Sequence, residues 1–83
     1  MTAGNREKLR QLLLDVFLLD PSEFRWDLER SQVETWDSLG TVSLAVGVQD
    51  VFGYHMAPAE ATGLKSLAEL VALLSARGVA LDG

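Results

Sequence analysis

The sequence contains no cysteine and only one histidine, His55. Without cysteine there is no disulfide scaffold, no thiolate metal site and no cysteine nucleophile. A single histidine excludes a histidine-rich metal cluster and leaves little for a serine–histidine dyad. Because His55 follows an apolar segment in a short connection, we interpret it as a surface or half-buried loop residue rather than a catalytic one.

Long apolar runs and basic patches are also missing. No run approaches the roughly 18 apolar residues that read as a membrane span, and residues 1–6 have no apolar signal-peptide core. We therefore expect a cytoplasmic protein that does not enter a membrane. The net charge is −5, with acidic residues concentrated between positions 15 and 37. Nucleic-acid binding is disfavoured, because no basic patch is present to neutralise phosphates.

The length of 83 residues predicts a single domain, residues 1–83, with one modest core. Met1 and the short tails predict a free-standing protein, for which the alternative is a module cut from a longer chain. A monomer is expected.

Apolar periodicity and helix-stop residues predict an all-α fold. Pro21 breaks the first periodic segment, and Ser66 with Glu69 forms the start of the last one. The expectation is a small bundle of three longer helices plus one short helix. The predicted helices cover about residues 6–19, 38–52, 57–62 and 66–77, and an ordered loop covers residues 20–37.

The helix predicted over residues 38–52 has two apolar stripes on nearly opposite faces. One consists of Leu44, Val48, Val51 and Phe52, and we assign it to the core because it is longer. The other consists of Leu39, Val42 and Val46. A small bundle has little room for a helix buried all round, so this second stripe is predicted to be exposed for a partner. Gly40 and Gly47 on the same helix are interpreted as sites of close helix packing.

The residues available for catalysis do not form a recognisable active site. Paired carboxylates occur only in the loop, where no cleft would exclude water, and there is no phosphate-binding glycine loop. Ser38 stands out because it follows the acidic loop, opens the helix with the two stripes and lies next to Asp37. Backbone N–H groups at a helix N-terminus can hold a phosphate ester, although a serine there can also be an ordinary helix cap. Both Asp37 and Ser38 are candidates for that cap.

The segment around Ser38 resembles the acyl carrier and peptidyl carrier protein family. The resemblance lies in an Asp-Ser-Leu motif at the start of the second helix and a Phe-Gly pair fourteen and fifteen residues after the serine. The order and lengths of the helices match the family over nearly the whole chain. The residues concerned are Trp36-Asp37-Ser38-Leu39, Val42, Leu44 and Val51-Phe52-Gly53.

This resemblance implies a non-catalytic protein that is itself the substrate of other enzymes. It implies that a phosphopantetheinyl transferase, with magnesium, attaches 4′-phosphopantetheine from coenzyme A to Ser38. The thiol of this arm would carry acyl or aminoacyl groups as thioesters, received from a loading enzyme and passed to downstream synthases or transferases. Asp37 would help the transferase orient metal and phosphate, and Leu39, Val42 and Val46 would contact partners.

The sequence departs from many fatty-acid carriers in having one acid, Asp50, on the second helix, so docking is expected to be apolar rather than electrostatic. Residues 54–56 also replace the aliphatic residues usual after Phe-Gly. With Trp36 before the motif, the sequence is similar to free-standing carriers of specialised-metabolite pathways, and this resemblance implies biosynthesis of the polyketide or nonribosomal type, including antibiotic pathways. The alternatives are a D-alanyl-type aminoacyl carrier, similar in its Asp-Ser-Leu-Gly-Thr-Val run, and an unmodified helical docking or adaptor domain. A small enzyme is disfavoured.

Overall fold

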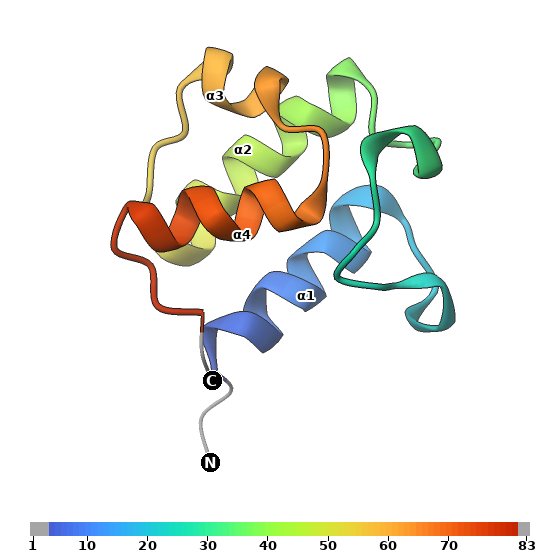
Figure 1. Ribbon diagram of the computed structural model, residues 1–83, viewed down its shortest axis with the longest axis horizontal. Coiled ribbons are helices and arrows are strands. Elements are labelled where there is room, and N and C mark those ends of the chain that lie inside the picture. Colours follow the sequence, from blue (N-terminus) through green and yellow to red (C-terminus); the bar gives the residue numbers. More distant parts are fainter. Residues whose placement is uncertain (1–3, 82–83) are drawn as a thin grey trace.

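The computed structural model describes residues 4–81, and all regular elements in this range are helical. Residues 1–3, part of the segment searched for a signal peptide, and Asp82, part of the charge count, lie outside it. The expected all-α class with three longer helices and one short one is confirmed (Figure 1). The elements are α1 (Asn5–Phe17), the 3-10 turns η1 (Pro21–Glu23) and η2 (Arg30–Gln32), α2 (Ser38–Phe52), α3 (Pro58–Gly63) and α4 (Leu67–Ala76).

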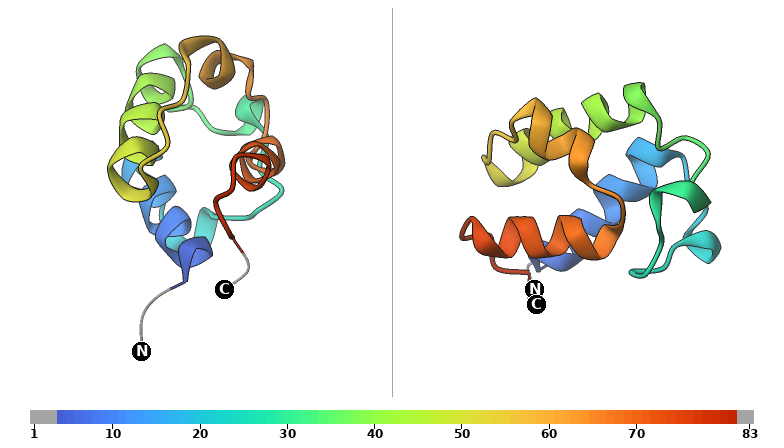
Figure 2. Two further views of the ribbon diagram at one scale, coloured as in Figure 1. Left: turned by 90° about the vertical axis from the view of Figure 1, so that its left-hand side faces the viewer. Right: turned by 45° about the horizontal axis from the view of Figure 1, so that its top comes forward.

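The helices surround a hydrophobic core to which every long helix contributes one face. Helix α1 packs against α2, and α3 lies between α2 and α4 at one edge of the bundle (Figure 2). The largest fully buried side chains come from α1, α2 and α4, and they follow the periodicity that predicted these helices. They are Leu9, Leu13, Phe17, Leu44, Val48, Leu67, Leu70 and Leu74.

Several predicted helix ends differ from those observed. The first helix was predicted to reach residue 19, but it ends at Phe17 because Leu18 adopts a left-handed conformation with φ of 55°. Helix α3 starts at Pro58 and not at residue 57, since proline favours the first helical position. Helix α4 is shorter than predicted because Ser66 is its N-cap and lies outside the helix.

The loop between α1 and α2 is ordered because its apolar side chains belong to the core. Leu28, Val33 and Trp36 are buried, and the ring of Trp36 stacks on that of Phe17 with centroids 5.0 Å apart. The loop is also tied to the start of α4 by a hydrogen bond from the Leu67 N–H to the Leu28 carbonyl oxygen, 3.0 Å long. The loop therefore holds the first residues of α2 in a fixed place.

Candidate functional site

Ser38 is the first residue of α2, and its hydroxyl has no structural task among the described residues. Asp37 provides the N-cap: its Oδ1 accepts a hydrogen bond from the Gly40 N–H at 2.9 Å, and its carbonyl oxygen accepts one from the Thr41 N–H. Ser38 is exposed, and within residues 4–81 its Oγ makes no hydrogen bond. Of the two cap candidates, the structure assigns the role to Asp37, and the Ser38 hydroxyl remains available.

The start of α2 is held against the rest of the protein by close packing. A Cβ atom at Gly40 would overlap the carbonyl oxygen of Thr35, and the Thr35 hydroxyl donates a hydrogen bond to the Phe17 carbonyl oxygen at 2.6 Å. At Gly47, also on α2, a Cβ atom would overlap the side chain of Leu12 on α1. Close helix packing is confirmed at Gly47, whereas the closest contact at Gly40 is with the loop backbone rather than with a helix. Both contacts keep Ser38 at a defined position.

The apolar stripe predicted to be exposed on α2 is exposed. The exposed fractions are 79% for Leu39, 61% for Val42 and 56% for Val46. The opposite stripe reaches the core through Leu44 and Val48, which are fully buried. The assignment of Val51 to the core was wrong, because this residue is 42% exposed near the end of the helix. The exposed stripe begins next to Ser38, so a partner that contacts it would also lie near the Ser38 hydroxyl.

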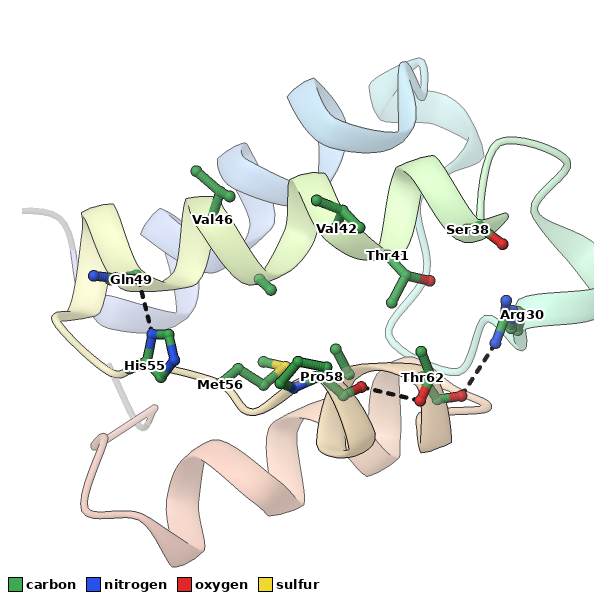
Figure 3. A pocket seen from close by; sticks show the side chains of 12 residues that line it. Arg30, Ser38, Thr41, Val42, Val46, Gln49, His55, Met56, Pro58 and Thr62 are labelled. Carbon is green, nitrogen blue, oxygen red and sulfur yellow. Dashed lines mark hydrogen bonds between the residues drawn. The ribbon is translucent and has the colours of Figure 1, made fainter.

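A groove of about 320 Å³ lies between α2 and α3 and includes Ser38 at one end (Figure 3). Its walls are mainly apolar and come from one face of α2 and from residues before and within α3. At the other end, the Nδ1 atom of His55 is 3.2 Å from the Oε1 atom of Gln49. The lining residues are Arg30, Ser38, Thr41, Val42, Ala45, Val46, Gln49, His55, Met56, Pro58, Ala61 and Thr62.

Most of these lining residues could not be identified from the sequence, because the groove exists only where α3 packs beside α2. His55 was interpreted as a loop residue without a catalytic role, and it is exposed in the loop after α2. Its position at the end of the groove was missed. Gln49 and Arg30 were missed as well, and the place of Arg30 depends on how the loop before α2 packs. The helical wheel could have pointed to Gln49, which lies one turn after Val46 on the same helix.

A hydrogen-bonded cluster fixes the connection from α2 to α3, which forms one wall of the groove. The Tyr54 hydroxyl donates to Glu60 Oε1 at 2.6 Å, and Arg77 Nη2 donates to Glu60 Oε2 at 2.8 Å. The bond from Tyr54, together with those from the Ala57 N–H and Arg77, lowers the pKa of Glu60 below its ordinary value of 4.5. The same bond raises the pKa of Tyr54 above 10.0. The cluster thus joins the connection, α3 and the end of α4.

The site offers an exposed, unbonded serine hydroxyl beside an apolar groove, and this fits a phosphopantetheine arm attached to Ser38. Asp37 already satisfies the helix cap, so esterification of Ser38 would break no hydrogen bond of the described structure. Within residues 4–81, no three histidine, cysteine, aspartate or glutamate side chains are grouped so that they could hold a metal ion. No helix in that range is long and apolar enough to cross a membrane.

A small helical bundle with a free serine at the start of its second helix is the arrangement expected of a carrier protein. Comparison with curated proteins supports this class. The chain is 33% identical over 76 residues to polyketide-8 synthase acyl carrier protein 2 of Streptomyces avermitilis, in an alignment that covers 92% of this chain and 87% of that protein. No family model and no solved structure matches the chain. At this identity and coverage, the chain belongs to the acyl carrier protein family.

Proposed function

We propose that this protein is an acyl carrier of polyketide-type biosynthesis, with residues 1–83 forming one carrier domain that acts as a cytoplasmic monomer. The observation that carries the proposal is the exposed Ser38 hydroxyl, which is unbonded in the described structure and begins α2 next to its aspartate cap. A phosphopantetheinyl transferase esterifies this hydroxyl with 4′-phosphopantetheine from coenzyme A, which breaks the pyrophosphate linkage of coenzyme A and releases adenosine 3′,5′-bisphosphate. When bound, the arm supplies a thiol for thioester formation, which the chain lacks because it contains no cysteine.

The chain itself contributes position and not catalysis in this proposal. Asp37 fixes the first turn of α2 by accepting a hydrogen bond from the Gly40 N–H, and the exposed Ser38 side chain belongs to that turn. The second carboxylate oxygen of Asp37 has no described protein partner, so it is free to help the transferase place magnesium and phosphate. Loading, elongation and release are then the work of partner enzymes.

The proposed docking face for these partners consists of Leu39, Val42 and Val46. These side chains are exposed beside the attachment point, and the only acid on α2, Asp50, lies near its other end. Apolar contact should therefore provide most of the affinity, while the acidic loop before α2 would favour a partner with basic groups at the rim. The transferase, the loading enzyme and the downstream synthases would use the same face in turn.

The relative named for a polyketide synthase favours an acyl cargo over an aminoacyl one. The groove between α2 and α3 is an apolar surface of suitable position, because it starts at Ser38 and is lined by Val42, Val46 and Met56. A D-alanyl-type aminoacyl carrier and a carrier of nonribosomal peptide synthesis remain the alternatives for the cargo. An adaptor domain that is never modified would use the same apolar stripe, and the modification itself distinguishes it.

The test is the intact mass after incubation with coenzyme A, magnesium and a broad-specificity phosphopantetheinyl transferase. The wild type should gain the mass of one phosphopantetheine, and Ser38→Ala should gain none. Ser43→Ala is the matched control, because Ser43 is another exposed serine of α2, and it should be modified like the wild type. Folded wild-type protein that is not modified by several transferases would contradict the carrier and support the adaptor.

The docking face is tested by the rate of the same reaction. Val42→Asp should lower kcat/KM for the transferase by about tenfold or more, because it places a charge in an apolar contact. Val51→Asp is the control on the same helix, since Val51 is also exposed but lies away from the groove. Equal losses in both variants, or none in Val42→Asp, would mean that partners do not dock on this stripe.

A further inference from the structure

Arg30 is held in place beside the start of α2 by hydrogen bonds from both its backbone and its side chain. Its N–H donates to the Lys65 carbonyl oxygen at 2.7 Å. Its guanidinium Nε donates to the Trp36 carbonyl oxygen at 3.1 Å, and Nη1 donates to that of Thr62 at 3.3 Å. Trp36 is two residues before Ser38, and Figure 3 shows the Arg30 side chain directed toward the N-terminal end of α2, where Ser38 lies.

The positive charge of Arg30 has no carboxylate partner within the described part of the chain. The ion pairs found there join other residues: Arg10 with Glu7, Arg25 with Asp27 and Arg77 with Glu60. Both acceptors of the Arg30 side chain are neutral carbonyl oxygens, and the remaining guanidinium N–H groups have no described partner. Arg30 also lines the same groove as Ser38, and no other arginine or lysine of residues 4–81 does so. A fixed cation with free donors therefore lies next to the proposed attachment point.

We propose that Arg30 binds the phosphodiester that links the arm to Ser38. The inference rests on the proposed modification of Ser38 and extends it to a residue outside the attachment motif. A guanidinium presents several N–H donors in a planar fork that matches the oxygens of a phosphate group. The segment from residue 15 to 37, which comprises the end of α1 and the loop, has a net charge of −5, so an added phosphate would be repelled there unless a cation faced it.

Arg30 bridges separate parts of the fold, and this gives the contact a structural consequence. It already connects η2 with the carbonyl oxygens that precede α2 and end α3. A phosphate bound by the same guanidinium would add a further link between η2 and the first turn of α2. Attachment of the arm should therefore stabilise the protein, and the first segment of the arm should be directed along the groove toward α3 rather than into solvent.

The test compares the unmodified and modified forms of the wild type and of Arg30→Gln by thermal unfolding at low salt. Modification should raise the Tm of the wild type by about 2–6 °C, the range expected for one charged contact in a domain of this size. This rise should be absent in Arg30→Gln and should become smaller at high salt. If Arg30 only stabilises the loop, Arg30→Gln lowers the Tm of the unmodified and modified forms equally. The rise in Tm on modification then persists, which overturns the proposal.

Arg25→Gln is the matched control, because Arg25 belongs to the same loop but is exposed and pairs with Asp27. It should retain the rise in Tm, and loss of the rise there too would show a general charge effect and overturn the proposal. If Arg30→Gln does not fold, the Arg30 Nε–H resonance of the wild type is the measurement. It should shift on modification, and an unchanged resonance overturns the proposal. Intact mass identifies the modified form in each sample, so a chain that never gains the arm contradicts the proposed function itself.

Discussion

Asp37 and Ser38 are adjacent, yet the structure gives them separate tasks at the start of α2. The Asp37 carboxylate replaces the missing intrahelical partner of the Gly40 N–H, which is what a helix cap does. The Ser38 side chain extends from the first helical position without a described protein partner. A serine that is free of structural duties can be modified without loss of stability.

This division predicts that two neighbouring substitutions differ in their effect on the free energy of unfolding. Asp37→Ala should lower the free energy of unfolding by about 1 kcal/mol through loss of the cap. Ser38→Ala should change it by less than about 0.5 kcal/mol. Chemical denaturation followed by circular dichroism measures both. Asp37→Asn, which keeps an acceptor for the Gly40 N–H, should stay near the wild type, and a loss as large as in Asp37→Ala would show that the charge matters more than the cap.

Gly40 makes a second prediction at the residue scale. Gly40→Ala should lower the free energy of unfolding by about 1–3 kcal/mol, because the new Cβ would overlap the Thr35 carbonyl oxygen, which is backbone and cannot rotate away. Gly63→Ala is the control, since a Cβ there meets no atom within 4 Å, and it should be neutral or stabilising by up to about 1 kcal/mol. Denaturant titrations of the two variants would contradict the close packing if Gly40→Ala were as stable as Gly63→Ala.

At the scale of elements, the groove depends on the connection between α2 and α3. Tyr54, Glu60 and Arg77 fix this connection, while Met56 is buried beneath it and His55 stays exposed at the end of the groove. All three members of the cluster lie close in space although they come from different elements. The shape of the groove should therefore depend on the ionised state of Glu60.

The lowered pKa of Glu60 predicts the direction of a pH effect. A carboxylate whose pKa is lower in the folded than in the unfolded state adds stability above the unfolded value, near 4.5. That stability is lost as the pH falls below 4.5 toward the folded pKa. The Tm difference between the wild type and Glu60→Gln should thus be largest near neutral pH and should shrink in this acidic window.

Tyr54→Phe provides the control for this pH effect, because the Tyr54 hydroxyl is the largest cause of the lowered pKa. In this variant the stability contributed by Glu60 should be lost over a narrower pH range on acidification, nearer to pH 4.5. The Tm difference between the wild type and Glu60→Gln could instead stay constant as the pH falls. That result would show that the charge of Glu60 does not contribute to stability.

For the whole molecule, the core joins α1, the loop, α2, α3 and α4 in one cluster of buried residues. Such a core predicts cooperative unfolding in a chain of this size. Both tryptophans, Trp26 and Trp36, lie in the loop before α2. Fluorescence therefore reports the loop and circular dichroism reports the helices, and the two transitions should coincide in urea. A fluorescence transition at a lower urea concentration than the circular dichroism transition would contradict the role of the loop as part of the core.

The sequence was sufficient to predict the parts of this molecule that depend on local signals. The bounds of α2 follow from Asp37 as its cap and Gly53 in a left-handed conformation as its end, and the exposed stripe follows from the helical period. The groove and the place of Arg30 depend on how η2 and α3 pack beside α2, which no local pattern specifies. The end of α1 was also missed, because a left-handed leucine carries no sequence signal.

The central claim, that Ser38 acquires an arm ending in a thiol, has a direct measurement in this chain because it contains no cysteine. After treatment with transferase, coenzyme A and magnesium, and removal of excess coenzyme A, a thiol reagent should detect one thiol per chain in the wild type. Untreated protein and treated Ser38→Ala should give none. A treated wild type without a thiol, or a Ser38→Ala variant with as much thiol as the wild type, would contradict the account.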